Sequence, residues 1–230
     1  METRIIQDPP VPASTSGDAA DPRTSTWPTF GPGEVAFLIA VPLLCAVLLI
    51  FHPAPDGNDI YGSLRDQADR MVIVHLLFLP FLGLLGAALF LLLRGMPGKA
   101  AQISRLAIVP FVVFYVAGDA IVGLATGVLV DHANDVPASD RAGVADASQE
   151  LWSNFITDDL LLGLGAAAWI LAAIAAAVAY RRAGAPVGVW VLLGLSSIFF
   201  YHAPPIGPLG LLCLAAAVAL LTRGARAPRG

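Results

Sequence analysis

Apolar residues are gathered into six long runs that polar segments separate, at residues 35–51, 71–93, 103–130, 160–180, 187–201 and 205–221. A helix needs about 20 mostly apolar residues to cross a hydrocarbon core of ~30 Å. The second, third and fourth runs meet that length, and the first and last are slightly shorter but nearly free of charge. The pattern predicts an all-α integral membrane protein, a bundle of about six transmembrane helices.

The fifth and sixth runs are separated by the segment YHAPPIGPLG. Two consecutive prolines followed by Gly-Pro cannot continue a helix. The break fits a tight turn between two spans, and it also fits a kink within one long segment.

Lysine and arginine placement favours two spans, because short cytoplasmic loops carry an excess of these residues. With six spans and a cytoplasmic N-terminus, ten of the thirteen fall on the cytoplasmic side. A single kinked segment would instead put the basic tail, 223–230, outside. We therefore expect both termini in the cytoplasm.

Besides the basic tail, 223–230, two polar segments flank or divide the expected bundle. Residues 1–33 are rich in Pro, Ser, Thr, Asp and Gly, a composition typical of a disordered tail, and they lack the form of a cleaved signal peptide. Residues 131–159 are the longest outer loop, and within it a helix starting near Ser139 or Asp140 is expected to lie at the interface. Trp152 and Phe155 would then sit at headgroup depth.

The composition supports a membrane protein. Hydrophobic residues make up 57% of the chain and charged residues 13%, whereas a soluble domain carries about a quarter charged residues. The net charge of -4 gives no indication of a nucleic-acid partner, so the lipid bilayer is the one partner implied. Arginine outnumbers lysine twelve to one, which is typical of a GC-rich bacterial genome and places the chain in a bacterial plasma membrane.

Asp119 stands out because an ionisable residue inside a span is costly and is by default a functional candidate. By helix rise it lies about 16 Å below Val130, near the middle of the bilayer. Tyr115 and Thr126 share its helix face. Two interpretations remain open: a functional carboxyl, or a protonated one that only bonds neighbouring helices.

The histidines also form a pattern, since all four lie at or near the outer face: His52, His75, His132 and His202. Imidazole binds zinc, copper, nickel or haem iron. No HxxxH, HExxH or CxxC spacing is present, and histidines are also common as polar residues at helix ends. If a metal or haem site exists, His75 and His202 are its best ligands. Contact between His75 and Asp119 would require an outward shift of the third span by ~10 Å.

One intramembrane aspartate with scattered histidines resembles the zinc-dependent membrane hydrolases of the ceramidase and adiponectin-receptor type. That family has seven spans and a paired HxxxH near its C-terminus, and this sequence has neither. We therefore transfer no residue role and no activity from the resemblance.

The sequence leaves three functional hypotheses. The first is a membrane protein that binds a metal, haem or small ligand in an outward-facing pocket lined by His75, Tyr115, Asp119 and His202. The second is a proton- or ion-coupled carrier that uses Asp119, and the third is a non-catalytic scaffold or accessory subunit. No catalytic motif decides whether the protein is an enzyme.

Overall fold

The structure, a computed structural model, describes residues 27–226 of the 230-residue chain. All regular secondary structure in this part is helical. The α-helices are α1 (Pro32–Ile50), α2 (Ile60–Leu64), α3 (Ala68–Leu92), α4 (Lys99–Pro110), α5 (Val116–Asp119), α6 (Thr126–Asp135), α7 (Ala138–Ser153), α8 (Gly163–Arg182), α9 (Val187–Leu195) and α10 (Ile206–Arg226). Most of the tail expected to be disordered, 1–33, lies outside the described residues.

Shorter helical segments join several of these helices into longer rods. Two are 3₁₀ segments, η1 (Arg65–Gln67) and η5 (Ser196–Phe200). Three are π-helical, with one extra residue per turn: η2 (Phe111–Tyr115), η3 (Ala120–Ala125) and η4 (Ile156–Leu162).

Five helical stretches of the described chain are long and apolar enough to cross a membrane: Pro32–Ile50, Ile60–Leu92, Lys99–Asp135, Ala138–Arg182 and Ile206–Arg223. The sixth apolar helix, Val187–Phe200, is shorter. The expected all-helical class is therefore confirmed for the described residues, and the five long apolar helices are compatible with a membrane bundle, while the count of six spans stays a prediction.

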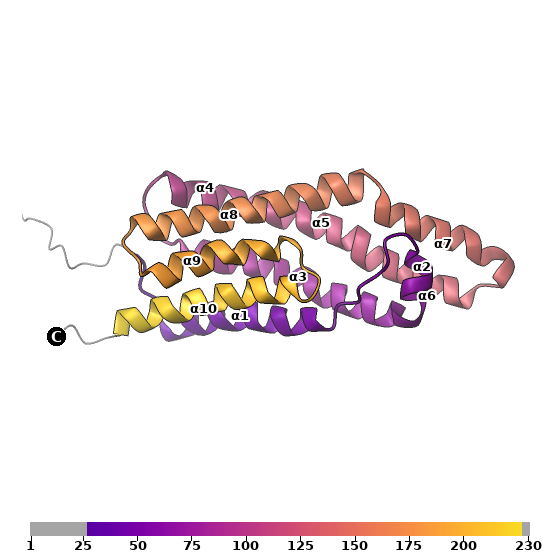
Figure 1. Ribbon diagram of the computed structural model, residues 1–230, viewed down its shortest axis with the longest axis horizontal. Helices are drawn as coiled ribbons and strands as arrows, with labels where there is room; N and C mark the ends of the chain where they lie inside the picture. Colours follow the sequence, from indigo (N-terminus) through magenta and orange to yellow (C-terminus); the bar gives the residue numbers. More distant parts are fainter. Residues whose placement is uncertain (1–26, 227–230) are drawn as a thin grey trace, which may run out of the picture.

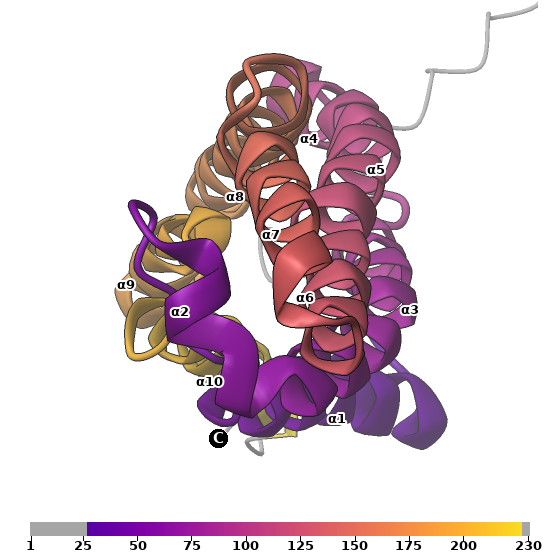
Figure 2. The ribbon, with the colours of Figure 1, turned by 90° about the vertical axis from the view of Figure 1, so that its right-hand side faces the viewer.

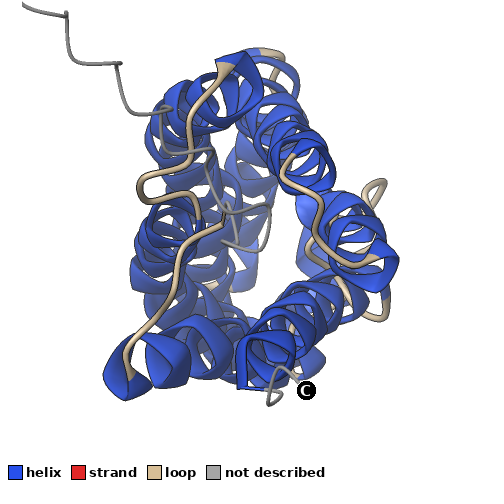
Figure 3. Cartoon of the chain, turned by 90° about the vertical axis from the view of Figure 1, so that its left-hand side faces the viewer, coloured by secondary structure: helices blue, strands red, loops and turns tan. Residues whose placement is uncertain are grey.

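The helices run along one long axis, and both ends of the described chain lie at the same end of the bundle (Figures 1 and 3). We call this the terminal end and the opposite one the distal end. Helices α9 and α10 pack against each other and are joined by residues 201–205 (Figure 1). The Pro-Pro break therefore turns the chain back on itself, and the single kinked segment is excluded.

The distal end is a helical cap formed by α2, α6 and α7 (Figure 2). Most of the expected loop 131–159 is thus helical, and α7 begins after Pro137, so Ser139 and Asp140 lie in its first turn. The Gln149 side chain of α7 donates to the Gly57 carbonyl at 2.8 Å and accepts from the Ile60 amide at 3.2 Å. These bonds fix the segment between α1 and α2.

The surface and the core of the bundle suit a bilayer. Many large apolar side chains are exposed along the rods, including Leu44, Ile73, Leu106 and Leu171. Small residues allow close helix packing inside: buried alanines of α8 face α4, and Ser104 donates to the Ala172 carbonyl at 2.7 Å.

Candidate metal centre

Three histidines from separate parts of the chain meet in the interior. His52 follows the end of α1, His75 lies within α3, and His202 lies between η5 and α10. Their ligand nitrogens all lie within 4.8 Å of one another. The His52 Nε2 atom is 3.1 Å from Nε2 of His75 and 3.2 Å from Nε2 of His202.

Backbone carbonyls set the orientation of two of these rings. Nδ1 of His75 lies 2.8 Å from the Met71 carbonyl, and Nδ1 of His52 lies 2.5 Å from the Pro53 carbonyl. A carbonyl oxygen only accepts hydrogen bonds. Each Nδ1 therefore carries the proton, and in the neutral ring Nε2 presents a lone pair.

Tyr115 sets the third ring in the same way. Its hydroxyl donates to the Phe200 carbonyl at 3.0 Å and lies 2.7 Å from Nδ1 of His202. Because the hydroxyl proton of Tyr115 is donated to the Phe200 carbonyl, the hydroxyl oxygen accepts a hydrogen bond from Nδ1–H of His202. Phe78 stacks on the other side of His202, with ring centroids 5.1 Å apart.

Burial favours the neutral form of His52 and His202, the two histidines that lie in segments connecting one helix to the next. Loss of hydration lowers the pKa of His52, and the same effect together with the neighbouring imidazoles lowers the pKa of His202 well below its usual range. Three neutral Nε2 atoms then point lone pairs at one another. Two acceptors at 3.1–3.2 Å cannot bond to each other, so a proton or a metal ion held between the Nε2 atoms would stabilise this arrangement.

The spacing suits a zinc-sized ion. Zinc binds histidine nitrogen at about 2.0–2.1 Å in tetrahedral geometry, which places two ligand nitrogens about 3.3 Å apart. The Nε2 separations from His52 to His75 and to His202, 3.1 and 3.2 Å, are close to that edge length, and all the ligand nitrogens lie within 4.8 Å.

Asp119 supplies a carboxylate to the same cluster. Its Oδ1 atom lies 3.5 Å from Nε2 of His202 and 3.8 Å from Nε2 of His75. The residue is 1% exposed, and Oδ2 has no hydrogen-bond partner within residues 27–226. A buried polar atom without a partner is costly and calls for an explanation, and a neighbouring cation provides one.

The other candidate residues from the sequence, Tyr115, Thr126 and His132, are not ligands of the cluster. Tyr115 contacts the cluster through His202, as described above. Thr126 is buried, and its hydroxyl lies 3.5 Å from the Ile121 carbonyl of its own helix, without lining the cavity described below. His132 is exposed on α6, thirteen residues and about 20 Å of helix rise from Asp119. The structure therefore brings together His52, His75 and His202 and leaves His132 apart from them.

The depth assigned to Asp119 from the sequence also changes. That depth was counted from Val130 as if the span ended there, but the helical rod runs from Lys99 to Asp135. Counted from Lys99, Asp119 lies about 30 Å along the rod. Helix α1, with 19 residues, rises about 28 Å, so His52 and Asp119 lie at about the same level along the bundle. No shift of the third span is needed for contact with His75.

The π-helical segments lie around this site. Segment η2 ends at Tyr115, η3 begins directly after Asp119, and η4 contains Asp158. The extra residue in a π turn re-aims the side chains beside it, and such turns are frequent at functional sites. Apolar periodicity does not reveal π turns, so this feature could not be predicted from the sequence.

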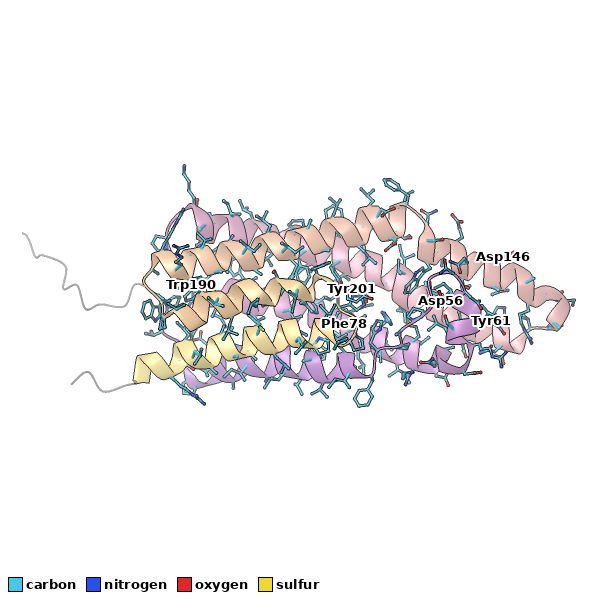
Figure 4. The ribbon with its side chains drawn as sticks, viewed as in Figure 1. Asp56, Tyr61, Phe78, Asp146, Trp190 and Tyr201 are labelled. Carbon is cyan, nitrogen blue, oxygen red and sulfur yellow. The ribbon has the colours of Figure 1, made fainter. Side chains whose placement is uncertain are left out.

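A cavity of about 400 Å³ adjoins the cluster and reaches all three histidines and Asp119. Its other walls come from η2 to η5, from α7 and α8, and from the segments that follow α1 and η5, and they are mainly apolar. Sequence reasoning did not single out the apolar wall residues, which include Val122, Leu162, Ala166, Phe200 and Pro204. Phe78 and Tyr201 mark the level of the site in Figure 4, between Trp190 and the distal Asp146.

Comparison of the chain with protein-family models, curated proteins and solved structures gives no match. The functional argument therefore depends on the site itself.

Proposed function

We propose that the protein is a membrane metalloprotein that holds one divalent transition-metal ion, zinc by its ligand chemistry, on His52, His75, His202 and Asp119. The observation that carries the proposal is the meeting of three imidazoles, whose ligand nitrogens lie within 4.8 Å of one another, beside the buried Asp119 carboxyl group. Imidazole nitrogen with one carboxylate oxygen in tetrahedral spacing is typical of zinc. The Nδ1 bonds to carbonyls and to Tyr115 are the outer contacts that metal-bound histidines commonly make.

Convergence of the ligands also favours this proposal over a proton-coupled carrier. A carrier that uses Asp119 alone would place the carboxylate in a water path away from the histidines. Here two imidazole nitrogens lie within 3.8 Å of it. The rival account of the cluster is one proton shared between neighbouring Nε2 atoms, with no metal bound.

Metal analysis separates these accounts. We expect the protein, purified in mild detergent and incubated with Zn²⁺, to retain about one zinc per chain after desalting, as a four-ligand site requires. Replacement by Co²⁺ should give visible absorption bands of tetrahedral cobalt. Less than about a tenth of an equivalent after incubation, with no cobalt bands, would support the shared proton and overturn the metal centre.

We further propose that the terminal end faces the cytoplasm of a bacterial plasma membrane, so that the metal centre lies near the outer face. The positive-inside rule supports this orientation, because Arg94, Lys99, Arg181 and Arg182 lie at helix ends and turns of the terminal end.

Cysteine labelling tests the orientation. In a Cys213→Ser background, Asp146→Cys at the distal end and Lys99→Cys at the terminal end are both on exposed positions. A membrane-impermeant maleimide should label Asp146→Cys in intact cells and Lys99→Cys only after lysis. The reverse pattern would place the termini outside.

A further inference from the structure

The cavity beside the candidate metal centre opens on the side of the bundle. Gly163, Phe200 and Tyr201 line the cavity and are also exposed on the surface, with Phe200 and Tyr201 46% and 53% exposed. Gly163 begins α8, Phe200 ends η5 and Tyr201 follows it; Ala54 and Asp158 also line the cavity and are exposed. One opening of the cavity therefore lies between the start of α8 and the end of η5, at the level of the histidines.

Exposed apolar side chains lie next to this opening, on the same segment as the exposed Asp158 and Asp159. Ile156, Leu160 and Leu164, on η4 and α8, are 58%, 41% and 44% exposed. Contiguous exposed apolar residues on a membrane bundle face lipid. A molecule in the distal leaflet can therefore reach the cavity sideways, without first entering water.

The cavity has two chemically different parts. The His52, His75, His202 and Asp119 cluster forms a polar wall, and Leu162, Ala166 and Phe200 belong to the apolar part. Asp158 lines the cavity and is exposed, which makes it the polar group of the mouth. At about 400 Å³, the volume is within the range of small-molecule sites.

We propose that the cavity binds a single-chain amphiphile from the surrounding leaflet, with an oxygen-bearing head group on the metal ion and the alkyl chain along α8. This inference rests on the proposed metal centre. A cation at one wall selects an oxygen donor, and the apolar walls with a lipid-facing opening select an alkyl chain. Neither a polar solute nor a purely apolar molecule matches both walls.

Hydroxamates on the cobalt-loaded protein in nanodiscs test the inference, because the hydroxamate group binds the metal and the cobalt bands report its arrival. Dodecyl hydroxamate is the amphiphilic probe and acetohydroxamate the head group alone. Ala166→Phe fills the apolar wall, while the neighbouring Ala167→Phe, exposed and outside the cavity lining, is the matched control. Gly163→Val, where an added Cβ meets nothing within 4 Å, narrows the mouth independently.

We expect Ala166→Phe and Gly163→Val to weaken dodecyl hydroxamate binding by about tenfold or more, while acetohydroxamate binding and the cobalt bands stay unchanged. Ala167→Phe should alter neither probe. Comparing one probe across variants removes the effect of its partitioning into the bilayer. Normal cobalt bands with unchanged dodecyl hydroxamate binding in both variants would overturn this inference alone, whereas absent cobalt bands in the unmodified protein would overturn the metal centre as well.

Discussion

His75→Ala should reduce zinc affinity by more than about 100-fold, beyond the range seen when only an outer contact of a metal ligand is lost. His132→Ala should leave one zinc per chain and an unchanged affinity. Both substitutions remove an imidazole from a helix near the distal part of the bundle, but His75 is 1% exposed within the cluster and His132 is exposed on α6. Zinc titration of the two purified variants provides the measurement.

The reason for the large effect is the loss of one of four ligands from a buried site. Replacing His75 leaves two imidazoles and one carboxylate, and water at the vacated position cannot supply the nitrogen that zinc prefers. Size-exclusion profiles of the two variants should match that of the unmodified protein, which separates metal loss from unfolding. Equal zinc content in a well-folded His75→Ala variant would show that the cluster does not hold the metal.

Much of the helical architecture is predictable because lipid imposes a simple rule on sequence. Every backbone polar group must be satisfied within the helix, so apolar runs of about 20 residues mark spans. This rule locates five long helices and the break before α10. It does not locate helix ends beyond the bilayer, where water removes the requirement, and so the extensions of α3 and α6 into the distal cap were missed.

The candidate site was predictable in its residue types and only partly in its geometry. His75 and Asp119 stood out because ionisable groups in apolar runs are costly, and His202 stood out because it directly follows such a run. His52 and His132 looked alike in sequence, as histidines at helix ends. What separates them is the length of the helical rod, because α6 carries His132 past the site while α1 ends beside it. That difference depends on tertiary contacts with α7, which periodicity does not encode.

Gly123→Ala should abolish stoichiometric metal binding although Gly123 has no side chain that could bind metal. A Cβ added at this position would lie 1.9 Å from Cδ2 and 2.3 Å from Nε2 of His75. The ring cannot turn aside cheaply, because its Nδ1 is held by the Met71 carbonyl at 2.8 Å. Overpacking of this kind costs about 1–3 kcal/mol, and we expect that loss in the free energy of unfolding together with the loss of zinc.

The matched control is Gly83→Ala in α3, where an added Cβ meets nothing within 4 Å. Alanine is the better helix former by up to about 1 kcal/mol, so this variant should be at least as stable as the unmodified protein and should bind zinc normally.

The double variant decides whether the clash with His75 is the cause. In the His75→Ala background the imidazole is absent, so the Cβ added by Gly123→Ala no longer clashes with it. The further loss of unfolding free energy caused by Gly123→Ala should then fall close to zero. The two changes would then show a coupling of about 1–3 kcal/mol, the size expected for residues in direct contact. An undiminished cost in the His75→Ala background would mean that Gly123 acts through the π-helical backbone of η3 rather than by making room for the imidazole.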